Sequence, residues 1–348
     1  ASGRWLNVTG RSHRGGWMTF LLDTDRERYL SMGLDRPFLS LGLGGMAFAA
    51  RAETGAGLIE HGDGSALHVA DLTGDEPRFT VVALESSPPP TFGMRLALSP
   101  SGEMALLTHE HGASLFSVES GRRVATATIA PGWRAASTRF FGRASARVFL
   151  IPDIPRHVSL PRAEMRILDV VVGRETRTAT VSLAASLDPV RAWPAFARPD
   201  PTGARFLTLD DGVRLRDGET GALLATLING AGTYQTAFTA DGRIVVGEGL
   251  GARVALHVFA PDGTAQADFT LEQTSAGLGV GPEVAPGHVA VHCGGLTDDY
   301  ETVVVDLSEG RVTESLPDLR PRRAYWMLDS PIVGPGDGVP RVHFLFRA

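Results

Sequence analysis

Residues 94–129 read MRLALSPSGEMALLTHEHGASLFSVESGRRVATATI and contain four short apolar runs separated by tight turns. The strands expected here are Met94–Leu98, Met104–Thr108, Ala113–Val118 and Val124–Ile129. Ser-Pro-Ser-Gly and Glu-Ser-Gly supply two of the turns, because proline presets one backbone angle and glycine accepts a left-handed one. No helical period runs through the stretch, so it predicts a unit of four antiparallel strands.

The same pattern returns twice further along the chain. One copy covers 193–228, with turns at 201–203 and 217–221, and another covers 234–271. Four strands that repeat about every 40 to 50 residues are typical of a β-propeller, in which each repeat forms one blade. A chain of 348 residues that is 43% hydrophobic and contains 41 glycines has the apolar material and the turns for this fold.

We therefore expect an all-β chain with a single domain over residues 1–348, a seven-bladed β-propeller of four-stranded antiparallel blades. The expected blades cover residues 2–37, 38–86, 91–130, 134–185, 193–228, 233–272 and 279–318. The tail, 322–348, holds strand-like segments, and one of them paired beside Trp5–Thr9 would close the ring and remove exposed sheet edges. Eight blades, with the tail as a degenerate last blade, is the alternative. Innermost strands such as Arg95–Leu98 are expected to be covered on both faces by neighbouring blades.

Two segments, Leu98–Gly102 and Val213–Gly221, resemble the repeat phrases of the bacterial WD-repeat-like and YncE-like β-propeller superfamilies. The resemblance covers most of the chain and implies the propeller fold. The Trp-Asp pair of strict WD repeats is absent from the sequence, so the Asp–His hydrogen-bond network of those repeats is not expected. Because propellers host many activities, the resemblance implies no single function.

The composition narrows the class of partner. A net charge of −6 argues against nucleic acid, whose binding domains are strongly basic. All 33 basic residues are arginine, which indicates a GC-rich bacterial genome. Cys293 is the one cysteine, so no internal disulfide is expected, and no apolar run reaches the roughly 18 residues of a transmembrane helix. The glycine clusters at 247–251 and 277–281 do not open a helix after a strand, and no cofactor is expected.

The first residues, Ser2–Val8, read as a turn followed by a strand, which is the middle of a repeat. This favours a first strand that lies upstream or one that the C-terminus supplies. One expectation is therefore the soluble part of a longer, membrane-anchored bacterial protein, in the cytoplasm or the periplasm. The sequence predicts no oligomeric state.

One short run carries possible metal ligands. His109-Glu110-His111 places two imidazoles two residues apart, on one face if the strand continues. That spacing can bind zinc, but a third ligand would have to come from another blade. Because the run leads into the turn at Gly112, a polar strand end is the preferred interpretation, and a metal site with His109 and His111 as ligands is the alternative.

The loops offer a binding surface. In a propeller, the loops between second and third strands and the connections between blades share one face. Arginine, tryptophan and tyrosine dominate binding hot spots, and the longest such loop is an insertion at 152–164. The candidate binding residues on this face are Arg11, His13, Arg14, Trp133, Arg156, His157, Arg162, Trp193, Asp298, Asp299 and Tyr300.

Two functions follow as hypotheses. The leading one is a non-enzymatic interaction, scaffold or sensor propeller that binds a protein or peptide through the loop-rich face, without a cofactor or insertion into a membrane. The alternative is a lactonase-like propeller hydrolase with a metal or acid/base group at the mouth of the central channel. His109, His111, Glu248 and Asp298 are the candidates for that site.

Overall fold

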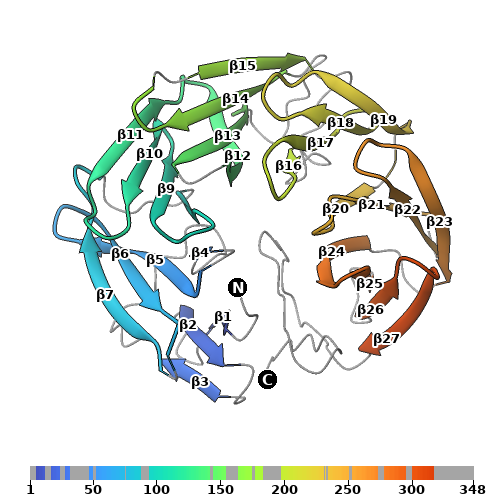
Figure 1. The fold of residues 1–348 in the computed structure, drawn as a ribbon, viewed down its shortest axis with the longest axis horizontal. Helices are drawn as coiled ribbons and strands as arrows, with labels where there is room; N and C mark the ends of the chain where they lie inside the picture. The colour runs from blue at the N-terminus through green and yellow to red at the C-terminus, as the bar shows by residue number, and fades with distance from the viewer. Residues whose placement is uncertain are drawn as a thin grey trace. The chain divides into compact units, whose positions relative to one another are not determined.

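All regular structure in the described part of the chain is β-strand (Figure 1). The computed structural model describes residues 5–11, 17–23, 28–31, 47–49, 52–74, 76–87, 94–141, 144–153, 164–174, 177–182, 197–230, 232, 234–250, 253–272, 278–294 and 300–316. Over these residues no helix is long and apolar enough to span a bilayer. Two compact units divide the chain, one of Ala1–Asp153 with Met165–Thr180 and the other of Ile154–Glu164 with Val181–Ala348.

Residues 5–182 form one three-stranded sheet, β1–β3, and three four-stranded sheets, β4–β7, β8–β11 and β12–β15, within the described ranges. Their strands are β1 (Trp5–Arg11), β2 (Trp17–Asp23), β3 (Arg28–Ser31), β4 (Ala47–Phe48), β5 (Thr54–His61), β6 (Gly64–Asp71), β7 (Arg78–Ala83), β8 (Arg95–Leu98), β9 (Met104–His109), β10 (Gly112–Ser117), β11 (Arg123–Thr128), β12 (Trp133–Phe140), β13 (Ser145–Pro152), β14 (Glu164–Val171) and β15 (Arg177–Ser182).

Residues 198–316 form three further four-stranded sheets, β16–β19, β20–β23 and β24–β27. Their strands are β16 (Arg198–Pro199), β17 (Arg205–Leu209), β18 (Gly212–Asp217), β19 (Leu223–Asn229), β20 (Tyr234–Phe238), β21 (Ile244–Gly249), β22 (Arg253–Phe259), β23 (Ala265–Glu272), β24 (Leu278–Ala285), β25 (His288–Gly294), β26 (Tyr300–Asp306) and β27 (Arg311–Leu316).

Every sheet is built from strands that follow one another in the sequence, paired antiparallel. This arrangement confirms the predicted all-β class and the four-stranded antiparallel repeat. The number of blades and the closure of a ring stay predictions, because the tail at 322–348 lies outside the described residues.

Burial in the sheet β8–β11 is greatest in its two middle strands. Ala105–Thr108 of β9 and Gly112–Phe116 of β10 are buried, whereas Arg95–Ala97 of β8 are half-buried. The expectation was that neighbouring blades cover Arg95–Leu98 on both faces; Leu98 is buried, but Arg95–Ala97 are less covered than the middle strands. The reason is that β8 is an edge strand with a neighbour on one side only, while β9 and β10 have strands on both sides.

The apolar core lies between consecutive sheets of one unit. In the first unit, Leu58 and Leu67 of β4–β7 share a buried cluster with Leu107 and Phe116 of β8–β11. In the second unit, β20–β23 and β24–β27 share another, with Leu256 packed in the same cluster as Val289, Val291 and Val303. In both pairs the sheets bury apolar side chains against each other, which is the main source of stability for such repeats.

The fourth strand of several sheets is offset by a bulge in its pairing with the third. Register shifts occur at Leu115/Phe116, Val258/Phe259 and Val304/Val305, and two occur in the β18–β19 pair. A bulge increases the local twist of the strand that carries it. The outer strands therefore turn away from a flat edge, which protects them from pairing with other chains.

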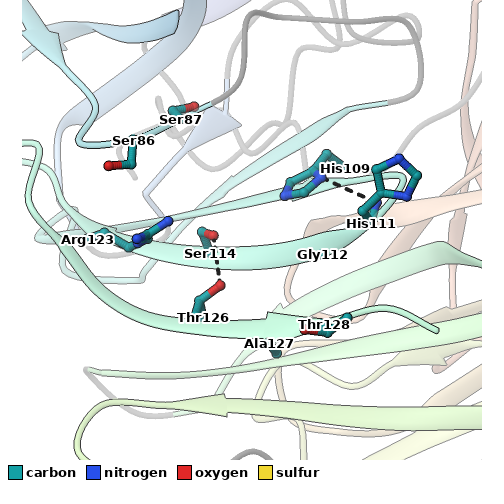
Figure 2. A pocket seen from close by; sticks show the side chains of 10 residues that line it. All are labelled: Ser86, Ser87, His109, His111, Gly112, Ser114, Arg123, Thr126, Ala127 and Thr128. Carbon is teal, nitrogen blue, oxygen red and sulfur yellow. Dashed lines mark hydrogen bonds between the residues drawn. The ribbon is translucent and has the colours of Figure 1, made fainter.

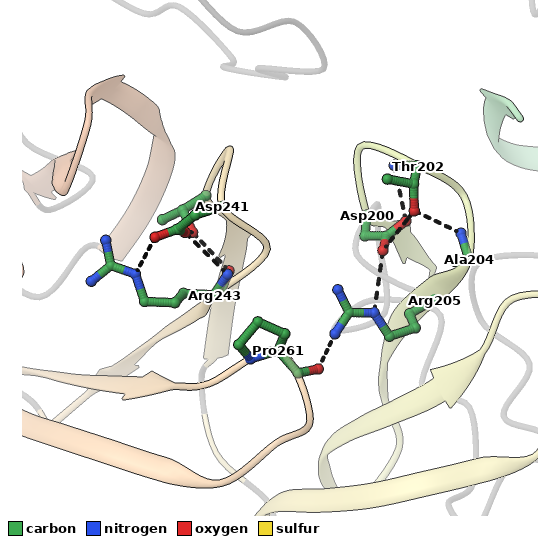
Figure 3. A network of polar contacts seen from close by, with 8 residues as sticks. Asp200, Thr202, Ala204, Arg205, Asp241, Arg243 and Pro261 are labelled. Atoms are coloured by element: carbon green, nitrogen blue, oxygen red, sulfur yellow. Dashed lines mark hydrogen bonds and ion pairs between the residues drawn. The ribbon is translucent and has the colours of Figure 1, made fainter. Parts of the chain in front are cut away.

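Polar contacts also join neighbouring sheets within the second unit (Figure 3). Arg205 of β17 pairs with Asp200 at 3.3 Å and donates a hydrogen bond to the carbonyl oxygen of Pro261, in the turn between β22 and β23. Glu283 of β24 accepts the backbone N–H of Ala240, which precedes β21, at 2.5 Å. These contacts fix each sheet against the next beyond what apolar packing supplies.

Candidate functional site

A hollow of about 530 Å³ lies in the first unit, over β10 and β11 (Figure 2). Its wall includes the segment that follows β7 and the turn that joins β9 to β10. The lining residues are Ser86, Ser87, His109, His111, Gly112, Ser114, Arg123, Thr126, Ala127 and Thr128. Figure 2 shows the two imidazoles near one end of the hollow and Arg123 near the other.

The segment after β7 is held against the start of β11 by backbone contacts. The N–H of Glu85 donates to the carbonyl oxygen of Gly121 at 2.9 Å, and a Glu85 carboxylate oxygen accepts the N–H of Arg123 at 3.0 Å. Ser86, the next residue, has a φ of 51°, in the left-handed region that non-glycine residues seldom adopt. Such backbone persists where the surrounding structure holds it, so this wall of the hollow is preformed.

The other wall depends on a close approach at Gly112. A Cβ at this position would lie 2.9 Å from the carbonyl oxygen of Ala127 and 3.2 Å from Nε2 of His109. Glycine therefore allows the imidazole of His109 to lie directly over the beginning of β10. A larger residue would displace either β11 or the imidazole.

The two histidines of the β9–β10 turn are coupled. The backbone N–H of His111 donates to Nδ1 of His109 at 3.3 Å, so Nδ1 is the acceptor and Nε2 carries the proton of the neutral ring. Burial lowers the pKa of His109 below its usual value, and the nearby His111 lowers it further. At neutral pH His109 therefore offers the hollow a neutral imidazole whose Nε2 is a hydrogen-bond donor.

The floor of the hollow is made of hydroxyl groups. Ser114 and Thr126 are opposite each other in the β10–β11 ladder, and their hydroxyl oxygens are 3.2 Å apart. The Thr126 hydroxyl donates to the carbonyl oxygen of Ala113 at 3.4 Å. In that arrangement the Ser114 hydroxyl donates to Thr126, and the pair forms a polar patch in a sheet that is otherwise apolar here.

His109 and His111 line the same hollow, but among the described residues no group of three or more His, Cys, Asp or Glu side chains is arranged so that it could hold a metal ion. The chemistry of this part of the structure is hydrogen bonding and charge, from hydroxyls, imidazoles and one guanidinium. That set of groups can hold a polar ligand.

The structure places only some of the predicted binding residues. Arg11 ends β1, Trp133 begins β12 and Tyr300 begins β26. Trp133 faces the guanidinium of Arg166, which lies 4.1 Å from the ring centroid, and it does not line the hollow. Outside the described residues lie His13, Arg14, Arg156, His157, Arg162, Trp193, Asp298 and Asp299.

Besides the two histidines, six lining residues with polar side chains have no counterpart among the predicted ones. They are Ser86, Ser87, Ser114, Arg123, Thr126 and Thr128. Small hydroxyl residues are common in strands and turns, so they carry little signal by themselves. The alternation Thr126-Ala127-Thr128 does show that the two threonines share a face of β11, and both are exposed while Ala127 is buried.

A second polar arrangement crosses the sheet β20–β23. His257 of β22 contacts Asp268 of β23 through Nδ1 at 2.7 Å and Glu248 of β21 through Nε2 at 3.4 Å. Glu248 is in turn opposite Tyr234 of β20 in the ladder. Burial raises the pKa of Tyr234 most, and the charge of Glu248 and its hydrogen bond to the tyrosine raise it further. Glu248, predicted as an enzyme candidate together with His109 and His111, is thus partnered by His257 and Tyr234.

Comparison with known proteins adds one result, at the level of the fold. No protein-family model matches the chain, and no curated protein matches it. The solved structure of the dihydro-heme d1 dehydrogenase NirN in complex with DHE has a TM-score of 0.57 and 16% sequence identity, over 91% of this chain. NirN and the other structural neighbours are β-propeller folds. The chain has a β-propeller fold.

Two peptidase structures resemble this propeller to a similar degree. A prolyl endopeptidase has a TM-score of 0.58 at 12% identity over 91% of the chain, and a Mycobacterium tuberculosis puromycin-hydrolyzing peptidase has 0.52 at 17% over 93%. The chain spans 64% of NirN and 48% and 54% of the two peptidases. At these identities the likeness concerns the fold alone.

Proposed function

We propose that this propeller is a binding domain, without catalytic activity of its own, that holds a segment of a protein or peptide in the hollow over β10 and β11. The observation that carries the proposal is which loops form the wall of the hollow. The connection after β7 and the β9–β10 turn are of the two loop types that share one face of a propeller. The same proposal includes seven blades, closure of the ring by the tail, and a relationship to the WD-repeat-like and YncE-like superfamilies.

Preformed walls support a binding role. The hollow is framed by two strands, a tight turn and a segment held by the two Glu85 contacts. A rigid site loses little conformational freedom when a ligand binds, so polar contacts of modest strength suffice. The volume of about 530 Å³ accommodates a few side chains of a peptide.

The test uses a displayed library of random peptides, selected on the purified chain and then measured one by one. Thr128→Trp places a large ring in the hollow from an exposed position at the end of β11. Thr180→Trp is the matched control, since Thr180 is an exposed threonine on β15 and does not line the hollow. We expect the selected peptides to bind the wild type and Thr180→Trp alike and to lose affinity for Thr128→Trp. Equal binding to all three, or a selection that enriches no peptide, would contradict the proposal.

A hydrolase is the second candidate, and the Tyr234–Glu248–His257–Asp268 row is the observation that favours it. A carboxylate that holds one nitrogen of an imidazole is a feature of general acid–base sites. The two peptidases among the structural neighbours are consistent with this reading. Chromogenic ester, lactone and peptidyl substrates would be offered to the wild type and to His257→Gln. Turnover by the wild type that His257→Gln abolishes would favour the hydrolase, and an absence of turnover would leave the binding domain as the better account.

A further inference from the structure

We propose that the hollow over β10 and β11 recognises an acidic peptide segment, with one carboxylate held by Arg123 and another by the His109–His111 turn. The inference rests on the proposed function, which places a peptide in this hollow, and it adds the chemical class of that peptide.

The donors and acceptors of the lining carry the argument. Five of the ten lining residues bear hydroxyls, two bear imidazoles and one bears a guanidinium, and none bears a carboxylate. A carboxylate only accepts hydrogen bonds, whereas hydroxyls, imidazole N–H groups and guanidinium all donate. The hollow therefore complements an acidic side chain better than a basic or an apolar one.

The charge of the hollow is opposite to that of the chain. The net charge is −6, yet the lining of the hollow contains the cationic Arg123 and two imidazoles and no acid. Of the two acids beside it in sequence, Glu85 accepts the backbone N–H of Arg123, and Glu110 is exposed in the β9–β10 turn. The lining of the hollow therefore differs in charge from the chain as a whole, and this difference favours an acidic peptide at the hollow.

The spacing within the hollow favours an extended peptide over a single anion. Figure 2 shows Arg123 and the histidine pair at separate ends, with the Ser114–Thr126 hydroxyl pair between them. Two acidic side chains on one peptide can therefore reach the two ends while the hydroxyls bind the intervening groups. Phosphopeptide sites use clusters of several arginines, whereas this lining contains a single arginine, Arg123.

The experiment measures fluorescence anisotropy of a labelled decapeptide of alternating Glu and Ser, with an alternating Gln and Ser peptide as the neutral counterpart. Arg123→Gln removes the guanidinium from the hollow. Arg122→Gln is the matched control, because Arg122 is the exposed neighbour in sequence and does not line the hollow. We expect the Glu peptide to bind about tenfold more tightly than the Gln peptide, a loss of about tenfold in Arg123→Gln, and a change of less than about twofold in Arg122→Gln. His111→Gln should weaken the Glu peptide and leave the Gln peptide unchanged.

Three outcomes would overturn the inference: equal binding of the two peptides, equal effects of Arg123→Gln and Arg122→Gln, or displacement of the Glu peptide by inorganic phosphate at concentrations where acetate has no effect. The last would identify a phosphate site. If library peptides without acidic residues still lose affinity for Thr128→Trp, the proposed function stands and the acidic specificity fails. If no peptide loses affinity for Thr128→Trp, the proposed function and the acidic specificity both fail.

Discussion

Gly121 and Ala83 approach so closely that a Cβ on the glycine would overlap the alanine's carbonyl oxygen. Gly121 lies in the turn between β10 and β11, and Ala83 is the last residue of β7 in the neighbouring sheet. The glycine also has a φ of 67° and accepts the N–H of Glu85 through its carbonyl. The turn therefore packs backbone against backbone where the two sheets meet beside the hollow.

Gly121→Ala should lower the free energy of unfolding by about 2–4 kcal/mol, because a left-handed backbone and a steric overlap both oppose the methyl group. Gly173→Ala is the matched control. Gly173 lies in the turn between β14 and β15 with a φ of 71°, and no atom lies within 4 Å of its Cβ position. Its substitution should cost about 1 kcal/mol. Urea denaturation followed by circular dichroism measures both, and equal losses would show that the contact with Ala83 is unimportant.

Replacement of the buried Asp210 should lower the stability of the protein. Its carboxylate accepts hydrogen bonds from Thr208 at 2.6 Å and from the guanidinium of Arg216 at 2.8 Å. Asp210→Ala leaves that guanidinium buried without its charge partner, which costs about 3–5 kcal/mol. The double variant Asp210→Leu, Arg216→Met should recover much of the loss, since it removes both charges.

The control for Asp210 is a surface pair. Arg134 and Asp153 are 3.6 Å apart with 37% and 63% of their side chains exposed, so Asp153→Ala should cost less than about 1 kcal/mol. Chemical denaturation of the four proteins gives the comparison. If Asp210→Ala is as stable as Asp153→Ala, or more stable, the predicted importance of the buried Asp210–Arg216 pair is wrong.

Arg205 should stabilise the second unit more than Arg243, although each side chain is 22% exposed. Arg205→Met removes the charge partner of buried Asp200 and the hydrogen bond to Pro261 in the neighbouring sheet. Arg243→Met removes a pairing with Asp241 that stays within one turn. We expect a loss of about 1–3 kcal/mol for the first and below about 1 kcal/mol for the second. Similar melting temperatures for the two variants would show that the contact between sheets adds nothing.

Stability should fall when the pH drops below the ordinary histidine pKa of 6.5. Burial lowers the pKa of His68, which stacks on Phe79, and burial and His111 lower that of His109. Below pH 6.5 the unfolded chain takes up protons that the folded chain refuses, so the folded state loses free energy until the lowered pKa values are reached.

Melting temperatures at pH 7.0, 6.0 and 5.5 measure this effect. His68→Phe keeps an aromatic ring against Phe79 and cannot be protonated, so it should lose less stability on acidification than the wild type. The carboxylates whose pKa is lowered, such as Asp71 and Asp306, start from an ordinary value of 3.8 and contribute only at lower pH. A melting temperature that does not change between pH 7.0 and 5.5 would contradict the prediction.

The local part of this fold could be predicted because its determinants are local. The Ser99–Gly102 turn follows from its proline and glycine, and the structure closes it with the N–H of Gly102 donated to the carbonyl of Ser99 at 2.9 Å. Strands on either side follow from short apolar runs. The His109–His111 pair was visible for the same reason, since two histidines two residues apart are read directly from the chain.

The features that only the tertiary structure decided depend on contacts between residues that are far apart in the sequence. The hollow joins Ser86 to Arg123 and Thr126, and nothing in the spacing of hydroxyl residues predicts which of them meet. Burial followed the position of a strand within its sheet, so β8 is less covered than β9 despite equally apolar residues. By itself the sequence determined repeat, strands and turns, because these depend on neighbours along the chain. The site arose only when sheets packed, because packing brings together side chains that no local preference connects.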